Sequence, residues 1–515
     1  MAIKKEKTLL CCCSCWFIVF LVVAGLFGGL FATFPFILEK FVEKQVAIVP
    51  GSTQTKNWIT PPVPLYATFT FLNINNPKEV SNGAKPNLTD IGPFYYKYFR
   101  NKFNVTWDED ESRVSYNLDT YYVFDEEKTG KLGDPCKHSI TTINVPLLGL
   151  LLQFESMKKT LIERGEEELV DILLKYYYKD TELFYTKRAC DILWGYNDPV
   201  LELLKTLKLT DMTVFSLETN HSTNDSLGWS TVRTGKYDPK LVGYYTQWNS
   251  LREIAPWNSS AARKLDGTGG YMFHPNVKHD DVLRAFVTEL FRSGAFVRSR
   301  DATVEGIDLF HYIVADYEFY NASAYPPNYG YSAFGKPGVL NLTAVFPQNL
   351  PVFVSLPHFL GADQSYLDGV IGMKPNRSIH EAFLEVEPMT GAVLHAAKRL
   401  QFNVQLNRDT NVKQLKNIRK STMFPWFIAT EESVITPSKA DEFKKDLLDP
   451  IRDIHIGLIV AVGVFGLLTI ILFLGTVYSC IRYWNYKKQD QAGSINSRTP
   501  LLSATTLLTQ TENST

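Results

Sequence analysis

The chain has almost no net charge, and this absence excludes one large class of function. Its 53 basic and 54 acidic residues give a net charge of −1, so it has no basic surplus to attract nucleic acid. Charged residues are 21% of the 515, slightly below the usual globular share, whereas 33 phenylalanines and 26 tyrosines suffice for a large aromatic core or cavity. The same composition excludes a chain that is disordered throughout.

Recognisable catalytic motifs are also absent. No His-Glu-x-x-His or Gly-x-Ser-x-Gly sequence occurs, and Gly267-Thr-Gly-Gly is more typical of a turn than of a phosphate-binding loop. The acidic run at 108–111 lacks the glycine and the spacing of a calcium-binding loop. The sequence therefore predicts no enzyme, no metal site and no cofactor, although a triad assembled in space would leave no such motif.

Long apolar runs occur only at the two ends of the chain. No charged residue lies between Thr8 and Leu38 or between Ile454 and Ile481, and each run is long enough to cross a bilayer. We expect transmembrane helices at 9–34 and 454–481. The alternative for the first run is a cleaved signal peptide, but the run exceeds a typical signal sequence and no clear cleavage site follows it.

The basic residues that flank these runs predict the topology. Lysines precede the first run and basic residues follow the second: Lys4, Lys5, Lys7, Arg482, Lys487 and Lys488. By the positive-inside rule, residues 1–8 and the tail 482–515 are cytosolic, and 35–453 forms one lumenal or extracellular domain. Eight N-x-S/T sequons in that domain, against roughly two from average composition, predict N-glycans there. They begin at Asn87, Asn104, Asn220, Asn224, Asn258, Asn321, Asn341 and Asn376, while Asn513 would be cytosolic and bare.

The seven cysteines fall into two groups. Five lie at the predicted cytosolic ends of the membrane helices: Cys11, Cys12, Cys13, Cys15 and Cys480. Juxtamembrane thiols favour S-palmitoylation, and the alternative is that they simply serve as small apolar residues. Only Cys136 and Cys190 are in the lumenal domain, where an oxidising compartment allows a disulfide. The sequence leaves open whether these two cysteines approach closely enough to form it.

Most of the lumenal domain has β-sheet patterns, with one helical insertion. Alternating or β-branched and aromatic residues predict strands at 66–74, 92–100, 113–124 and 399–406. Between them, 146–210 has helical spacing, with a break near Gly165 and a helix start at Asp198-Pro199. Its apolar face at 147–154 either packs on the sheet or forms a partner surface.

Several short motifs carry a resemblance to a known family. They are Ile91-Gly-Pro-Phe-Tyr-Tyr96, Leu193-Trp-Gly-Tyr196, Phe273-His-Pro275, Pro357-His-Phe359, Ala362-Asp363, Gly372-Met373, Pro375-Asn376, Pro388-Met-Thr-Gly391 and the stretch from Ala396 to Gln401. Their order and spacing resemble the CD36 or class B scavenger receptor family, most closely its lysosomal integral membrane protein branch. The resemblance covers nearly all of 35–480.

This resemblance implies an α+β membrane-anchored fold. We expect a large antiparallel β-barrel-like domain with an apical helical bundle at 146–210, an internal apolar tunnel and two terminal transmembrane helices. Family members are receptors for lipids, lipoproteins or protein ligands, and the lysosomal branch also carries a hydrolase to lysosomes. The candidate ligand-binding residues at the apex are Lys158, Lys159, Arg164 and Lys175, although nearby glutamates offset their charge.

The chain departs from the family in three respects. The family's cysteines between about 290 and 350 are missing, and the apical segment 155–175 contains no histidine for pH-dependent release. The tail carries Leu501-Leu502, which resembles the branch's signal for sorting adaptors, with Ser497 where an acidic residue is usual. We expect an endolysosomal receptor. The alternatives are a plasma-membrane scavenger receptor, a two-span channel and a tethered ectoenzyme.

Overall fold

The computed structural model describes residues 2–177, 179, 181–219, 221–223, 228–331, 336–346 and 349–496. The chain divides into two compact units: residues 1–40 with 442–515, and residues 41–441, which we call the body. Each unit has its own packing, so each is described separately.

The first unit is built from two long helices, α1 (Ala2–Gln45) and α13 (Asp449–Asn496). Both are long and apolar enough to cross a membrane, which fits the predicted two-pass topology. Aromatic rings join them: Phe27 stacks on Phe465 with centroids 5.2 Å apart, and Phe17 lies 5.5 Å from Phe473. The helices extend beyond the predicted spans of 9–34 and 454–481 because polar turns continue them at both ends.

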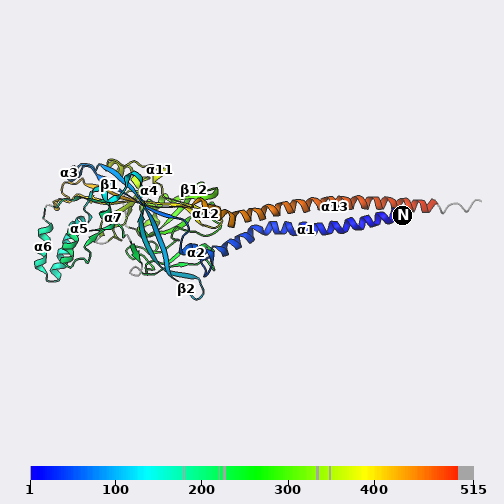
Figure 1. Cartoon of the computed structure of the whole chain (residues 1–515), viewed down its shortest axis with the longest axis horizontal. Helices are drawn as coiled ribbons and strands as arrows, with labels where there is room; N and C mark the ends of the chain where they lie inside the picture. Colours follow the sequence, from blue (N-terminus) through cyan, green and yellow to red (C-terminus); the bar gives the residue numbers. More distant parts are fainter. Residues whose placement is uncertain are drawn as a thin grey trace, which may run out of the picture. The chain divides into compact units, whose positions relative to one another are not determined.

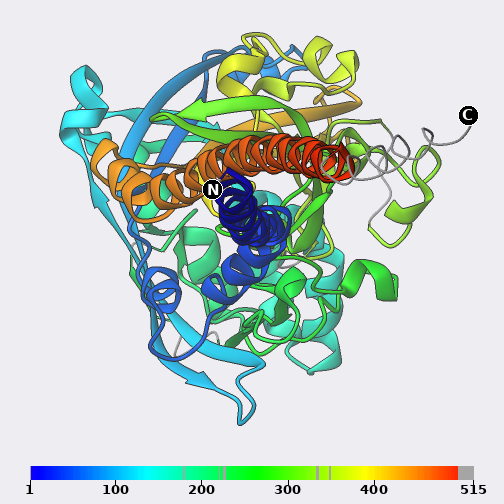
Figure 2. The same cartoon turned by 90° about the vertical axis from the view of Figure 1, so that its right-hand side faces the viewer.

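The body is organised around one large antiparallel sheet (Figures 1 and 2). Its main path has the order β10-β9-β3-β2-β1-β18-β17-β16-β13-β12-β11, with β8, β14 and β15 pairing beside it. The main-path strands are β1 (Leu65–Ile74), β2 (Leu88–Trp107), β3 (Arg113–Phe124), β9 (Ser230–Arg233), β10 (Tyr245–Gln247), β11 (Leu283–Val287), β12 (Arg292–Val304), β13 (Ile307–Val314), β16 (Phe383–Val386), β17 (Val393–Asn407) and β18 (Ser421–Val434). The side strands are β8 (His221–Thr223), β14 (Leu340–Asn341) and β15 (Val352–Ser355). All four predicted strands are present.

The two edges of this sheet are connected by a glycine turn, so the sheet is nearly closed. The Tyr245 N–H in β10 donates to the Gly267 oxygen at 2.9 Å, and the Thr268 N–H donates to the Arg284 oxygen in β11 at 3.0 Å. A Cβ on Gly267 would lie 2.4 Å from that Arg284 oxygen, and its φ of +126° also requires glycine. This turn, at the position where the sequence suggested one, therefore completes a barrel-like body.

The remaining helices lie mainly in the connections between the strands. They are α2 (Thr53–Ile59), α3 (Pro77–Ser81), α4 (Glu126–Thr129), α5 (Val145–Glu163), α6 (Glu167–Tyr177), α7 (Ala189–Trp194), α8 (Pro199–Thr206), α9 (Ser260–Arg263), α10 (Gln364–Asp368), α11 (Arg377–His380) and α12 (Pro437–Phe443). Figure 1 shows α5 and α6 side by side at one end of the body, and Gly165, with φ +72°, forms the turn between them. Asp198 caps α8 through its bonds to Val200 N and Leu201 N, as the sequence predicted.

The predicted helical insertion at 146–210 is not entirely helical. It contains β5 (Phe184–Arg188), which pairs with β4 (Ser139–Ile143), and β6 (Tyr196–Asn197), which pairs with β7 (Val214–Phe215). The apolar stretch at 147–154 packs mainly inward, since most of its residues join the main hydrophobic core and only Leu152 is well exposed. Of the two alternatives for that stretch, packing on the sheet or forming a partner surface, the structure therefore shows packing.

Candidate ligand-binding site

The four basic residues predicted to bind ligand lie on or beside α5 and α6: Lys158, Lys159, Arg164 and Lys175. They do not form a cationic face. Lys158 pairs with Glu155 at 3.0 Å and Lys159 pairs with Glu163 at 3.6 Å, both within the same helix. Arg164 donates to a backbone oxygen 2.9 Å away. The helices therefore present a mixed surface, and a ligand-binding role for these residues stays a prediction.

A different set of charged residues meets on the buried face of the sheet. In β2, Tyr96, Tyr98, Arg100 and Lys102 share one face because alternate residues of a strand point the same way. The register then places Tyr96, Ala67, Glu431 and Lys398 in one row across β2, β1, β18 and β17. We call Arg100, Glu289, Lys398 and Glu431 the charged cluster.

Lys398 is the centre of the charged cluster. Its Nζ lies 2.8 Å from Glu289 Oε1 and 2.8 Å from Glu431 Oε1, while Arg100 is 3.9 Å from the other oxygen of Glu431. These side chains are only 14% to 31% exposed, so water screens the pairs weakly. Two cations thus balance two carboxylates inside the body.

Burial and charge shift the pKa values around this cluster in opposite directions. Burial alone would raise the pKa of Glu289, but Lys398 lowers it, and Glu289 and Glu431 hold the pKa of Lys398 above its ordinary value. Glu218 lies outside the pairs. Burial, together with repulsion by Glu289 and Glu431, raises its pKa to about 8, so this carboxyl is protonated at neutral pH.

Aromatic side chains continue the polar face. Tyr98 stacks on Tyr122 at 4.4 Å, and the Arg100 guanidinium lies 5.0 Å from the ring of Tyr271. Burial raises the pKa of Tyr98 to about 12 and that of Tyr271 still further. Tyr271 nevertheless keeps 43% of its surface accessible. Further along β2, Lys102 donates to the Trp58 backbone oxygen at 2.7 Å, and burial followed by Arg100 lowers its pKa to about 7.

Sequence patterns alone do not reveal this cluster, although they contain part of the signal. Alternation along 92–100 could have placed the aromatic and basic residues of β2 on one face. The partners Glu289 and Lys398 are distant in sequence, and only the strand register brings them together.

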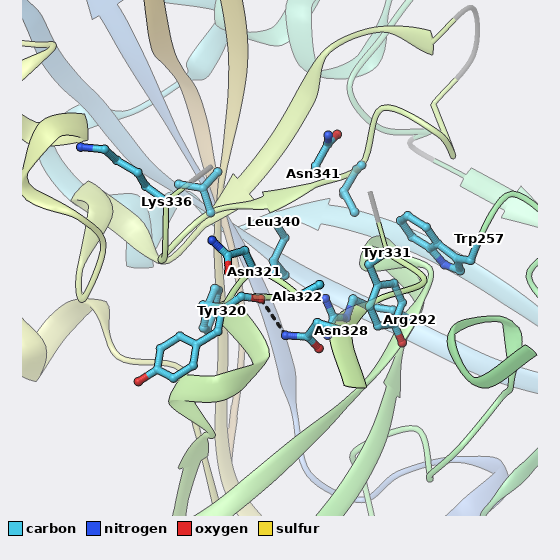
Figure 3. A pocket seen from close by; sticks show the side chains of 13 residues that line it. Trp257, Arg292, Tyr320, Asn321, Ala322, Asn328, Tyr331, Lys336, Leu340 and Asn341 are labelled. Atoms are coloured by element: carbon cyan, nitrogen blue, oxygen red, sulfur yellow. Dashed lines mark hydrogen bonds between the residues drawn. The ribbon is translucent and has the colours of Figure 1, made fainter. Parts of the chain in front are cut away.

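One enclosed pocket lies elsewhere in the body and is shown in Figure 3. Its volume is about 30 Å³, against roughly 300–1,000 Å³ for sites that take drug-sized ligands. Arg292 lies on its wall with the guanidinium 3.8 Å from the Tyr331 ring, and pairs with Glu318 at 2.6 Å. The Asn328 side-chain nitrogen donates to the backbone oxygen of Tyr320 at 2.7 Å. The pocket suits a water molecule or two rather than a lipid.

A second polar network spans β13, β16 and β17. Glu385 accepts from His311 Nδ1 and from His395 Nδ1, each at 2.8 Å, and His395 Nε2 lies 3.7 Å from Glu432. Burial would lower the pKa of His395, but Glu385 and Glu432 raise it to about 9, and the two histidines hold the pKa of Glu385 near 2. The described residues contain no group of three or more such side chains arranged to hold a metal ion.

The structure places six of the eight predicted glycosylation sites. Asn104, Asn258 and Asn376 are exposed and Asn87, Asn321 and Asn341 are half-buried, while Asn220 and Asn224 lie outside the described residues. Asn321, Asn341 and Asn376 each use Oδ1 to accept a backbone N–H two residues ahead, whereas a glycan is carried on the side-chain nitrogen. Their occupancy stays a prediction.

The cysteines are also placed. Cys136 and Cys190 form a disulfide with Cα atoms 4.9 Å apart, which joins the turn at 135–137 to α7 and brackets α5 and α6. Cys15 and Cys480 are exposed free thiols in α1 and α13. The side chains of Cys11, Cys12 and Cys13 lie outside the described residues, as do Leu501 and Leu502, so palmitoylation and sorting stay predictions.

Comparison with known proteins identifies the family to which the chain belongs. A model of the CD36 family matches residues 16–478. Lysosome membrane protein 2 of Mus musculus is 30% identical over 471 residues, covering 90% of this chain and 93% of that protein. The Homo sapiens protein of the same name is 28% identical over 476 residues with the same coverage. Scavenger receptor class B member 1 of Mus musculus is 28% identical over 464 residues, 88% of each chain. The family match includes the entire body, and this chain therefore belongs to the CD36 family.

Proposed function

We propose that this protein is an endolysosomal membrane receptor for lipid or lipoprotein ligands, with both termini in the cytosol and the body in the lumen. The observation that carries the proposal is the similarity to lysosome membrane protein 2 over 90% of the chain, together with a family match at 16–478 that reaches into both apolar helices. The chemistry is binding and not catalysis, because relatives of this kind are membrane proteins and scavenger receptors.

Lipid passage through the body is part of the same proposal. An apolar ligand that leaves water for an apolar interior gains about 0.8 kcal/mol for each buried CH₂ group. The ring of Tyr271, which keeps 43% of its surface accessible beside the charged cluster, supports such a path. Arg100, beside this ring, would face an anionic end of a lipid.

Mass spectrometry of lipids that co-purify with the full chain tests the lipid proposal. The protein is extracted in a mild detergent and compared with an unrelated two-span membrane protein from the same cells. We expect specific lipids to exceed the control. A lipid content equal to the control's would remove the support for an internal path.

The location is tested separately, through the tail. Replacing Leu501 and Leu502 by alanine is expected to move the protein from endolysosomes to the cell surface, because paired leucines would no longer bind sorting adaptors. Replacing Leu507 and Leu508 is the matched control in the same tail. Endolysosomal residence of both variants would refute the sorting signal.

The second candidate is a plasma-membrane class B scavenger receptor that takes up lipoproteins or particles. The similarity to scavenger receptor class B member 1 favours it, and surface residence of the unaltered protein would select it. Carriage of a lysosomal hydrolase on the helices α5 and α6, which the resemblance implies for the lysosomal branch, belongs to the first candidate. Co-purification of a hydrolase that is lost in Lys158 and Lys159 variants would support that role.

A further inference from the structure

Positive charge is concentrated in the loop that joins β17 to β18, residues 408–420, which we call the basic loop. Antiparallel neighbours are usually connected by two to five residues, and ordered loops beyond about a dozen are uncommon unless they serve a function. The basic loop has five basic residues and one acidic residue, in a chain whose net charge is −1. Its length and charge together set it apart from the other connections of the sheet.

A pattern with a period of three residues determines which side chains of the loop face solvent. Three apolar residues are buried in the main core, at 5%, 1% and 3% exposure: Val412, Leu415 and Ile418. An exposed basic residue follows each of them directly: Lys413, Lys416 and Arg419. Successive turns, with Leu415 N donating to Val412 O at 2.9 Å and Ile418 N donating to Leu415 O at 3.2 Å, explain the repeat. The core therefore anchors the loop while the cations face solvent.

An open groove of about 560 Å³ lies against the start and end of the basic loop. Arg408 and Lys420 line it together with Asn407, Thr410 and, from α5, Leu152. The one acidic residue, Asp409, also lines the groove, and its carboxylate accepts the Asn411 N–H at 2.8 Å. Within the described part of the chain, the loop residues Arg408, Lys416, Arg419 and Lys420 form no ion pair, so their charge is available to a ligand.

We propose that the basic loop and its groove bind a sulfated polysaccharide. A row of closely spaced cations matches a polymer of repeated anionic groups, and the interleaved amide and hydroxyl side chains of Asn407, Thr410 and Asn417 can hydrogen-bond to sugar hydroxyls. A membrane surface fits less well, because the loop's apolar residues are all buried and none can insert. A protein partner fits less well, because the loop exposes no aromatic anchor.

This proposal rests on the proposed lumenal or extracellular position of the body, since sulfated polysaccharides occur there. It does not need a lipid path. The helices α5 and α6 offer paired charges, so the basic loop supplies a cationic surface that they lack.

The test measures binding of the full chain, in detergent micelles, to immobilised heparin. The test variant carries Arg408→Gln, Lys416→Gln, Arg419→Gln and Lys420→Gln. The control variant removes four exposed basic residues from other parts of the body, by Lys56→Gln, Lys131→Gln, Lys240→Gln and Arg252→Gln. At about 0.15 M salt we expect the test variant to bind about tenfold or more weakly and to elute at lower salt, with the control close to the parent. All eight residues are exposed, and equal melting temperatures would show that both variants fold.

Three competitors distinguish the class of ligand. Heparin and dermatan sulfate should displace the parent protein, while desulfated heparin should not. If polyglutamate or phosphatidylserine vesicles bound through the same four residues and heparin did not, the polysaccharide assignment would be wrong. Equal loss in the two variants would overturn it as well, because only overall charge would then matter. A protein that retained no lipid but bound heparin through the loop would refute the lipid path and leave this proposal standing.

Discussion

At the scale of single residues, the charges inside the body are paired in balanced groups. Lys398 shows this best, since it lies directly opposite Glu431 across two strands and also reaches Glu289. Removing one member of such a group costs more than the group contributes as a whole, because it leaves a charge buried without its partner.

Replacing Lys398 by methionine should therefore lower the free energy of unfolding by about 3 kcal/mol. Urea unfolding of the full chain in detergent, followed by tryptophan fluorescence, measures the difference. The matched control is Lys97→Met in β2, whose ion pair with Asp125 is 3.8 Å long and half-exposed on the lysine side. The control should cost less than about 1 kcal/mol. Equal costs would show that removing Lys398 does not leave a buried charge without its partner.

The pH dependence of this cluster has a definite sign. Lys398 depresses the pKa of Glu289 in the folded state, so the resulting stability is present above its ordinary value of 4.5 and is lost as the pH falls below it. Without Lys398, burial raises the pKa of Glu289, so this carboxyl can take up a proton in the folded variant. The difference between the parent and Lys398→Met should accordingly be largest at pH 7 and should shrink as the pH falls. A difference that did not change between pH 7 and strong acid would contradict the assignment.

His395 contributes stability over the opposite range. Its folded pKa is about 9 against an ordinary 6.5, so the contribution is complete below 6.5 and is lost as the pH rises through 9. We expect His395→Gln to lower the free energy of unfolding by about 2 kcal/mol in mild acid and to have little effect in alkali. Melting curves recorded from mild acid to alkali measure the stability difference between the parent and the variant. His279→Gln, at an exposed position, is the control. A pH-independent loss would mean that the imidazole acts only through packing.

At the scale of elements, the disulfide brackets α5 and α6 from outside them, whereas the basic loop is anchored by buried residues of its own. Cys136 and Cys190 close a segment that includes α5 and α6, and closing a loop of this length contributes about 3–4 kcal/mol by limiting the unfolded chain. Replacing both by serine should reduce stability by that amount and speed tryptic cleavage between the two positions. Cys480→Ser in α13 is the control, and unchanged cleavage would show that α5 and α6 hold their place without the bridge.

The basic loop allows a test that alters no charge. Leu415→Ala removes a side chain that is 1% exposed, and such truncations cost about 2–5 kcal/mol. The cost should appear as local loosening of the loop, so heparin affinity should fall although all five cations remain. Ile162→Ala on α5, at 48% exposure, is the matched control and should leave affinity unchanged. If Leu415→Ala bound heparin as tightly as the parent, heparin binding would not depend on the buried residues that hold the loop's cations in position.

At the scale of the whole molecule, local patterns predicted the elements better than the contacts between them. Strands with alternating residues, the cap at Asp198 and both apolar helices were predicted because each signal lies within a few residues of sequence. The strands inside 146–210 were missed because β5 and β6 are short and depend on their partners β4 and β7. The charged cluster and the basic loop were missed for a related reason: register and burial decide which side chains meet, and neither is local.

Topology is the property on which the receptor proposal depends, and the chain contains its own control. If the body is lumenal, Asn→Gln changes at the exposed sequons Asn104, Asn258 and Asn376 should each remove one glycan and increase gel mobility. Asn513→Gln in the tail should change nothing, because a cytosolic sequon never meets the glycosylation machinery. Protease added to sealed vesicles should then shorten the protein only by its tail. Glycan loss at Asn513, or digestion of the body in sealed vesicles, would reverse the orientation and with it the receptor proposal.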